Sequence, residues 1–260
     1  MFRLTFAFAL AGLAYAVQPR LVDDRIVGGQ HAKIQDYPYQ LSFEISNKHN
    51  CGASLIKPNV AITAAHCTIG QNSSFITLRG GSNFVHKGGQ VVKVLNICNN
   101  PKYTRSIIDY DVSVLLLDPA FVLCDNVQTI PLQPVNLDVP TGTVANVSGW
   151  GRLSADGESP TQLQIVQVPK VEDSECEKSY KKSNNTITNR MVCFGYTKGG
   201  KDACQEDSGG PLVINGKLFG IVSWGRGCAA PEFPGVYAKV SHPEIHKYVN
   251  DCLTKFKSLL

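Results

Sequence analysis

Short runs of alternating or β-branched apolar residues recur along most of the chain. The clearest are bounded by Gly, Pro, Asn or Ser and span residues 39–45, 90–94, 143–147 and 217–222. Alternation with a period of two puts every second side chain on one face of a strand, and turn residues between such runs favour short antiparallel strands. The pattern predicts an all-β body, and it shows no repeat or low-complexity segment.

The last stretch of the chain has a different period. Between His242 and Leu260, apolar side chains recur at the spacing of one helix face: Ile245, Tyr248, Val249, Cys252 and Phe256. Such spacing predicts one amphipathic helix that packs on the β body.

The first sixteen residues have the pattern of a secretory signal peptide. Arg3 supplies a positive charge, Leu4–Leu13 is apolar, and Ala14-Tyr15-Ala16 has the small-x-small pattern of a cleavage site. This apolar run is too short to span a bilayer, and no later run approaches about 18 apolar residues. We therefore expect residues 1–16 to be removed and the protein to be secreted, extracellular and not bound to a membrane.

Composition and charge exclude little. The chain has 260 residues, of which 43% are hydrophobic and 18% charged, so one or two ordinary globular domains fit. A net charge of +4 gives no support for nucleic acid or an anionic membrane as a partner. Residues 45–108 hold basic side chains and no Asp or Glu, which predicts a basic face. A solvated surface is the simpler interpretation of that face, and an exosite for acidic partners is the alternative.

Nine cysteines in a secreted chain indicate disulfides. The count is odd, so at least one thiol is free or pairs with another molecule. Spacing alone does not assign the bridges. The chain has no CxxC pair, which argues against a structural zinc site.

The strongest chemical signal is Ser208 in the stretch Asp202-Ala-Cys-Gln-Glu-Asp-Ser-Gly-Gly-Pro211. Glycines allow a sharp bend that holds the hydroxyl outward. A serine needs a base to become nucleophilic. His66 in Thr63-Ala-Ala-His-Cys67 is the candidate base, and Asp111, which precedes an apolar run, is the candidate orienting acid.

These motifs, in the order His, Asp, Ser, resemble the chymotrypsin and trypsin family of serine proteases over residues 26–260. The resemblance implies two six-stranded antiparallel β-barrels with a C-terminal helix and the active site in the cleft between the barrels. His66 and Asp111 belong to the first barrel and Ser208 to the second, with the boundary near residues 132–138. It also implies protein or peptide substrates, protein protease inhibitors as partners, a monomer, and no cofactor.

The same resemblance implies the roles of the site residues. Ser208 attacks the scissile carbonyl, His66 moves the proton, and Asp111 holds the imidazole. The backbone N–H groups of Ser208 and Glu206 form the oxyanion hole. Glu206 departs from the family, which usually has Gly there, so we expect reduced or selective activity. The alternative is that its side chain points to solvent and acts on the leaving-group side.

A specificity pocket is implied around Asp202, six residues before Ser208. Ser223, Gly225 and Gly235 match its walls, and an acid at the base of a deep slot selects Arg or Lys. Ala203 stands where Ser is frequent. Because a Lys ammonium then loses a partner while an Arg fork keeps both bonds to the acid, we expect Arg over Lys.

Residues 17–25 read as an activation propeptide before Ile26-Val-Gly-Gly29. Cleavage after Arg25 would free the Ile26 amine, which in the family pairs with the acid before the nucleophile, here Asp207. An ordinary linker is the alternative. The pocket would allow self-activation, although Asp23 and Asp24 are poor neighbours for an acidic cleft.

Three disulfides follow from the resemblance: Cys51–Cys67, Cys176–Cys193 and Cys204–Cys228. A Cys98–Cys252 bridge to the C-terminal helix is a further prediction. The loop of residues 80–89 lacks the carboxylates that bind calcium in related trypsins, so we expect no metal. Asn72 and Asn184 begin glycosylation sequons in predicted loops, whereas the sequon at Asn146 lies in a predicted strand, where we do not expect it to be used.

The sequence thus predicts a secreted serine endopeptidase that cleaves after Arg and Lys by acyl-enzyme hydrolysis and is made as a zymogen. The alternative is a weak or inactive homologue that binds partners through the same cleft. An esterase or lipase is disfavoured by the motif order and by the absence of a G-x-S-x-G elbow. The absence of an extra module favours digestion over a cascade.

Overall fold

The structure is a computed structural model that describes residues 28–154 and 157–259. The predicted signal peptide, the propeptide, Arg25 and Ile26 lie outside the described residues, so those predictions stay predictions.

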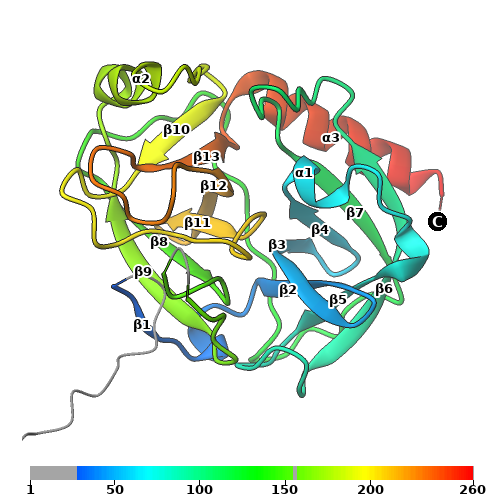
Figure 1. Cartoon of the computed structure of the whole chain (residues 1–260). Coiled ribbons are helices and arrows are strands. Elements are labelled where there is room, and N and C mark those ends of the chain that lie inside the picture. The colour runs from blue at the N-terminus through cyan, green and yellow to red at the C-terminus, as the bar shows by residue number, and fades with distance from the viewer. Residues whose placement is uncertain (1–27, 155–156, 260) are drawn as a thin grey trace, which may run out of the picture.

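Two β units lie side by side, and α3 runs beside the first of them (Figure 1). The first unit is a closed barrel of six strands, joined in the order β2 (Gln40–Ile45), β3 (Lys48–Lys57), β4 (Val60–Thr63), β7 (Ser113–Asp118), β6 (Gln90–Asn99) and β5 (Ile76–Gly80). All of its pairings are antiparallel. The predicted first barrel is confirmed.

The second unit is a seven-stranded sheet in the order β1 (Gln30–His31), β9 (Gln164–Pro169), β8 (Val144–Gly149), β11 (Pro211–Ile214), β12 (Lys217–Trp224), β13 (Gly235–Lys239) and β10 (Met191–Phe194). Strands β9 and β10, which end the sheet when the two-residue β1 is left aside, share no ladder. Lys170, just after β9, forms a single antiparallel bridge with Phe194, and Gly195 N–H donates to Pro169 O at 2.9 Å. The sheet therefore curls into an incomplete barrel, with β1 as an added strand outside it.

Three α-helices occur in the described residues: α1 (Ala65–Thr68), α2 (Asp173–Lys181) and α3 (Pro243–Lys257). The predicted C-terminal helix is α3, whose apolar face is buried in the first core. The N-terminal end of α3 is capped by His242, whose Nδ1 accepts the Glu244 N–H at 3.3 Å. The sequence pattern did not predict α2, because only Cys176, Ser179 and Tyr180 of its residues are buried.

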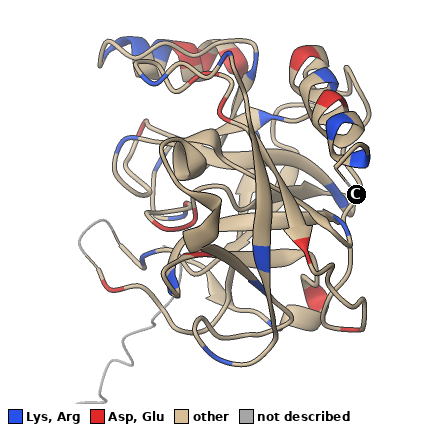
Figure 2. Ribbon diagram, turned by 90° about the vertical axis from the view of Figure 1, so that its right-hand side faces the viewer, with Lys and Arg blue, Asp and Glu red and all other residues tan. Residues whose placement is uncertain are grey.

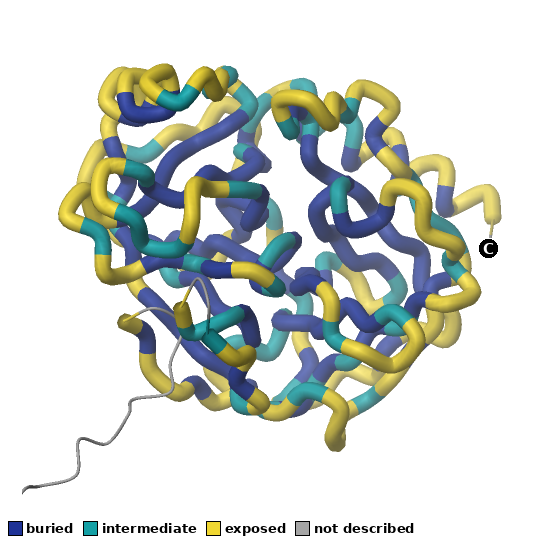
Figure 3. Tube along the Cα trace, viewed as in Figure 1, coloured by how far each residue is buried: buried dark blue, intermediate teal, exposed yellow. Residues whose placement is uncertain are grey.

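One apolar cluster fills the first barrel and continues under α3 to Val213, Leu218 and Ile221 of the second unit, and another lies inside the second unit. The buried strands lie inside a shell of exposed loops (Figure 3). The segment between β7 and β8 crosses from one unit to the other. Leu132 packs on the first core and pairs with Leu218 of β12, whereas Val139 packs on the second core. A boundary near residues 132–138 is compatible with this crossing and stays a prediction.

Four disulfides are present, Cys51–Cys67, Cys98–Cys252, Cys176–Cys193 and Cys204–Cys228. They include all three pairs that the resemblance implied and confirm the predicted pairing of Cys98 with Cys252. Cys124 is the free, exposed thiol that the odd count required.

The expected basic face is partly neutralised by acids from outside residues 45–108. Arg79 Nε donates to Glu44 at 2.8 Å, and Lys102 Nζ donates to Glu244 at 2.5 Å. Both helices at the surface carry acidic and basic side chains next to each other (Figure 2). Among the described residues, no helix has the length and apolar character needed to cross a membrane.

Candidate active site

His66 and Asp111 meet because their strands pair. His66 follows β4 in the short helix α1, and Asp111 precedes β7. The two strands are antiparallel with Thr63 opposite Ser113, so the end of one lies beside the start of the other. His66 donates from Nδ1 to Asp111 Oδ2 and from its backbone N–H to Oδ1, both at 2.8 Å. The backbone bond holds the carboxylate in place, and the bond to Nδ1 orients the imidazole.

Asp111 is buried, with 1% exposure, and it also accepts the Ser223 hydroxyl at 2.6 Å. We predicted Ser223 as a pocket wall, and the structure shows that its hydroxyl bonds to the carboxylate as well. Burial lowers the pKa of His66, but the hydrogen bond to Asp111 and its negative charge outweigh this and raise the pKa above the ordinary value. The pair therefore favours a protonated imidazole, which is what a general base must become.

Ser208 reaches this pair from the second unit. Gly52 N–H in β3 donates to Ser208 O at 2.8 Å, which docks the serine turn on the first barrel. Gly209 has a φ of 81°, and a Cβ there would lie 2.1 Å from Thr63 Oγ1, so only glycine fits. No hydrogen bond joins Ser208 Oγ to His66 in the parts of the chain that the structure describes. Such bonds are commonly long without substrate.

The turn leaves two backbone donors unused. Within the described ranges, the N–H groups of Glu206 and Ser208 have no acceptor. Their directions are set by the carbonyls of the same peptide units, because N–H and C=O of a trans peptide point opposite ways. Gln205 O accepts the Arg152 N–H at 2.8 Å, and Asp207 O accepts the Gly210 N–H at 2.9 Å. Two fixed, unpaired donors beside a serine suit an oxyanion.

Glu206 has a left-handed backbone, with a φ of 76°. This explains why glycine is usual at this place, since a residue with a Cβ is strained there. Its carboxylate lies 4.0 Å from Arg152 Nε, and the two side chains are 31% and 42% exposed. The side chain therefore sits between the expected alternatives, half in solvent and half against Arg152.

His49 is a neighbour of the site that no sequence motif singled out. Its Nε2 lies 3.2 Å from Glu206 O, its Nδ1 lies 2.8 Å from Ser42 Oγ, and its ring stands edge-on to Trp150. Burial lowers its pKa to about 4. His49 is thus neutral, and its hydrogen bond to Glu206 O holds the peptide between Glu206 and Asp207 in place. No motif surrounds it, because the contact joins residues 157 positions apart.

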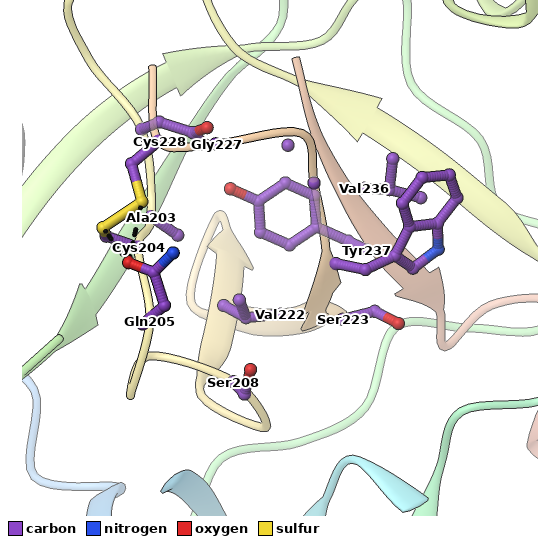
Figure 4. A pocket seen from close by; sticks show the side chains of 14 residues that line it. Ala203, Cys204, Gln205, Ser208, Val222, Ser223, Gly227, Cys228, Val236 and Tyr237 are labelled. Atoms are coloured by element: carbon purple, nitrogen blue, oxygen red, sulfur yellow. Dashed lines mark hydrogen bonds between the residues drawn. A yellow bond between two sulfur atoms is a disulfide. The ribbon is translucent and has the colours of Figure 1, made fainter. Parts of the chain in front are cut away.

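A cavity of about 180 Å³ opens beside Ser208 (Figure 4). The Cys204–Cys228 disulfide and Gln205 border one side, and Val222 and Ser223 lie on another. In the close-up the Ser208 hydroxyl is directed toward this hollow.

Asp202 lines the cavity and is 4% exposed. Its Oδ2 accepts the Ala229 N–H at 3.1 Å, whereas Oδ1 is buried and has no partner among the described residues. Burial raises the pKa of Asp202 to about 7. A Cβ on Gly235 would lie 2.6 Å from that free Oδ1, and one on Gly225 would meet nothing closer than 3.8 Å. The glycine at position 235 therefore leaves the space beside the acid free of a side chain.

Asp207 is fully buried beneath the serine turn. Its oxygens accept the N–H groups of Gly151 at 2.8 Å and Cys204 at 3.0 Å. Burial raises its pKa to about 7. Across residues 28–154 and 157–259, no cationic side chain lies within 4.0 Å of it.

One group of metal-ligating side chains appears in the described residues, formed by Cys51, His66 and Cys67. Its two sulfurs are joined in a disulfide, and His66 is bound to Asp111. This group does not suit a metal ion.

A serine on a sharp turn of one β unit, next to a hydrogen-bonded His–Asp pair on the other and to a cavity that holds a buried carboxylate, is the arrangement of a serine protease. The comparisons with known proteins agree. Residues 26–247 match the Trypsin family. The chain is 44% identical to a trypsin of Simulium vittatum, over 89% of this chain and 95% of the relative. It is 38% identical to a vitellin-degrading protease of Bombyx mori, over 98% and 96% of the two chains. It is 41% identical to trypsin alpha of Drosophila melanogaster, over 85% of each. The chain belongs to the trypsin family of serine proteases.

Proposed function

We propose that the protein is a secreted endopeptidase that cleaves peptide bonds after Arg, and less well after Lys. The observation that supports this most strongly is Asp202, a buried carboxylate in the cavity beside Ser208, with one oxygen unpartnered. An unpaired buried acid is unfavourable, and a substrate cation relieves it.

The reaction would run as acyl transfer. His66 takes the proton of Ser208 Oγ as the oxygen attacks the scissile carbonyl, and the Glu206 and Ser208 N–H groups bind the oxyanion that forms. His66 then gives the proton to the leaving amine. Water, activated by the same imidazole, releases the acyl group from Ser208. Asp111 stabilises the imidazolium through its hydrogen bond to Nδ1 and its negative charge.

The preference for Arg rests on Ala203, which lines the cavity without a hydroxyl. A guanidinium can bond both oxygens of Asp202, whereas an ammonium makes point contacts and needs further acceptors. A matched pair of amide substrates that differ only in Arg or Lys tests this. We expect a higher kcat/KM for Arg, and a Lys preference would contradict the proposal.

Activity itself is tested with protein cleaved after Arg25, with Ser208→Ala as the control. Turnover of an Arg-amide substrate that disappears in the variant supports a serine nucleophile. An Asp202→Asn variant with intact turnover of Arg substrates would refute the role of the pocket acid.

Activation after Arg25 is the second element of the proposal. A Cβ on Gly28 would lie 2.5 Å from Gly200 O, so the chain just after the cut packs against the segment that leads to Asp202. A new amine at Ile26 that pairs with Asp207 would neutralise the buried carboxylate under the serine turn. An Arg25→Gln variant resists cleavage by trypsin-like activators. It should stay inactive while its fold and its four disulfides are unchanged.

A second candidate function is a weak or inactive homologue that binds partners through the cleft. Only the strained Glu206, beside the oxyanion donors, favours it. Correctly processed protein that has an Ile26 N-terminus and no turnover would support this candidate. In that case Glu206→Gly should restore activity.

Secretion, the monomeric state, binding of protein inhibitors and a digestive role belong to the proposal as well. The names of the relatives point to different biological roles, since one is named a trypsin and another a vitellin-degrading protease.

A further inference from the structure

The segment of residues 104–111, which leads to β7, is tied to the second unit by a buried ion pair. Asp109 lies two residues before Asp111 and is 3% exposed. Arg190, just before β10, donates from Nε to both oxygens of Asp109 at 3.0 and 3.1 Å, and from Nη2 to Oδ2 at 2.5 Å. This fork is a geometry that Arg provides and Lys does not.

The remaining capacity of the Asp109 carboxylate is also used. Oδ1 accepts the Tyr110 N–H at 2.8 Å and the Thr188 hydroxyl at 3.1 Å. The guanidinium of Arg190 also lies over the Tyr110 ring, 4.4 Å from its centre. The far end of that ring donates its hydroxyl to Glu244 of α3 at 2.9 Å. Arg190 therefore holds two consecutive residues of the segment at once.

The backbone between these contacts is contorted. Ile108 has a φ of 52° and Tyr110 a φ of 54°, although neither is glycine. A β-branched residue is rarely found in this region. Val112 N–H donates to Tyr110 O at 2.8 Å, so the chain turns tightly around Asp111. Such conformations persist only where surrounding contacts hold them in place.

We propose that the Asp109–Arg190 pair is a positioning device that holds residues 108–112 in this shape and so aims the Asp111 carboxylate at His66. The proposal rests on the proposed function, because it concerns the same His–Asp–Ser site. The pair joins the unit that carries Asp111 to the unit that carries Ser208. It is therefore placed to fix the two halves of the site relative to each other.

The readout follows from the partners of Asp111. The described groups that bond to it are His66 and Ser223, and Tyr103 is near enough to have its pKa raised by burial and by the charge of Asp111. When Asp111 moves away, His66 loses the partner that raises its pKa, and its pKa falls. An ion pair that only adds stability would leave the pKa of His66 unchanged.

Two variants test the pair, and neither leaves one partner charged and unpaired in the interior. Arg190→Lys keeps the charge and removes the fork. The double variant Asp109→Asn, Arg190→Gln removes both charges and keeps the shape. The matched control is Lys182→Gln, which breaks an exposed ion pair with Glu232 at 2.9 Å on the same unit.

We expect kcat on an Arg-amide substrate to fall by roughly 10- to 100-fold in both variants, since small misplacements in a site have effects of this size. KM and the affinity for benzamidine, a probe of the Asp202 cavity, should stay within about twofold. The acid limb of the kcat/KM profile should move to lower pH, and the control should match the parent protein.

The same shift is measured without catalysis by NMR titration of His66 in the Ser208→Ala background. If the parent protein shows no turnover, the proposed function fails, and this titration still decides the role of the pair. An unchanged His66 titration with unchanged kcat overturns the proposal, even where the melting temperature falls. A fall in both kcat and benzamidine affinity also overturns the proposal, because the variants then disturb the Asp202 cavity as well as the position of Asp111.

Discussion

Glu206 offers the sharpest quantitative test, because backbone strain and charge coincide at one residue. Its φ of 76° lies in the left-handed region, which disfavours residues with a Cβ by about 1–2 kcal/mol. Against this stands the contact with Arg152 at 4.0 Å between partly exposed side chains. An exposed pair of this kind contributes at most about 1 kcal/mol.

Three variants separate the two effects. Glu206→Gln removes the charge and keeps the strain, Glu206→Ala removes the charge and the polar end, and Glu206→Gly removes both charge and strain. Because glycine suits a positive φ, we expect the Gly variant to be more stable than the Ala variant by about 1 kcal/mol. For a chain of this size that corresponds to a rise in Tm of about 2–4 °C. Thermal unfolding in the Ser208→Ala background avoids self-digestion.

Activity reports the charge separately. One oxyanion donor contributes about 2.7–4 kcal/mol to catalysis, and Glu206 retains its N–H, so the carboxylate can remove only a part of this. We expect kcat to rise about three- to tenfold in both the Gln and the Gly variants, which is a gain of about 0.7–1.4 kcal/mol. A Gly variant no more stable than the Ala variant would refute the strain argument. An unchanged kcat in the Gln variant would refute the electrostatic one.

The remaining predictions concern the pocket and the surface. The pKa of Asp202 is raised to about 7 by burial, and its charged form binds a cation, so benzamidine affinity should be present above pH 7 and be lost as the pH falls through 7. Calorimetry should show a roughly tenfold weaker affinity at pH 6 than at pH 8, and the affinity of the Asp202→Asn variant should not change with pH. An affinity of the parent protein that is the same at both pH values would contradict the shifted pKa. Gly235→Ala should lower kcat/KM for Arg substrates at least about tenfold, because its Cβ would lie 2.6 Å from Asp202 Oδ1, whereas Gly225→Ala should have a smaller effect. Asn184 is exposed, so protein from a eukaryotic secretory host should lose glycan mass at this site in Thr186→Ala and keep it in Thr186→Ser; identical masses for all three would show that the sequon is unused.

Much of the fold was readable from the sequence. The predicted strand of residues 39–45 is β2, and the helical spacing near the C-terminus is α3, because the apolar period of each element is local. The three disulfides implied by the resemblance are present, and the predicted Cys98–Cys252 bridge is confirmed. The helix α2 was missed, since a mostly exposed helix has little apolar pattern.

The amino-acid sequence alone predicts the family and the candidate catalytic residues, from a serine in a glycine turn, a His and an Asp in the order of a known triad, and an acid six residues before the serine. The left-handed backbone of Glu206, the half-buried His49 behind it and the ion pair of Asp109 with Arg190 became visible only in the folded protein. The last two join residues 157 and 81 positions apart, whose contact depends on how the two β units pack. Local periodicity does not predict such pairs, because their residues come together only after both units have formed.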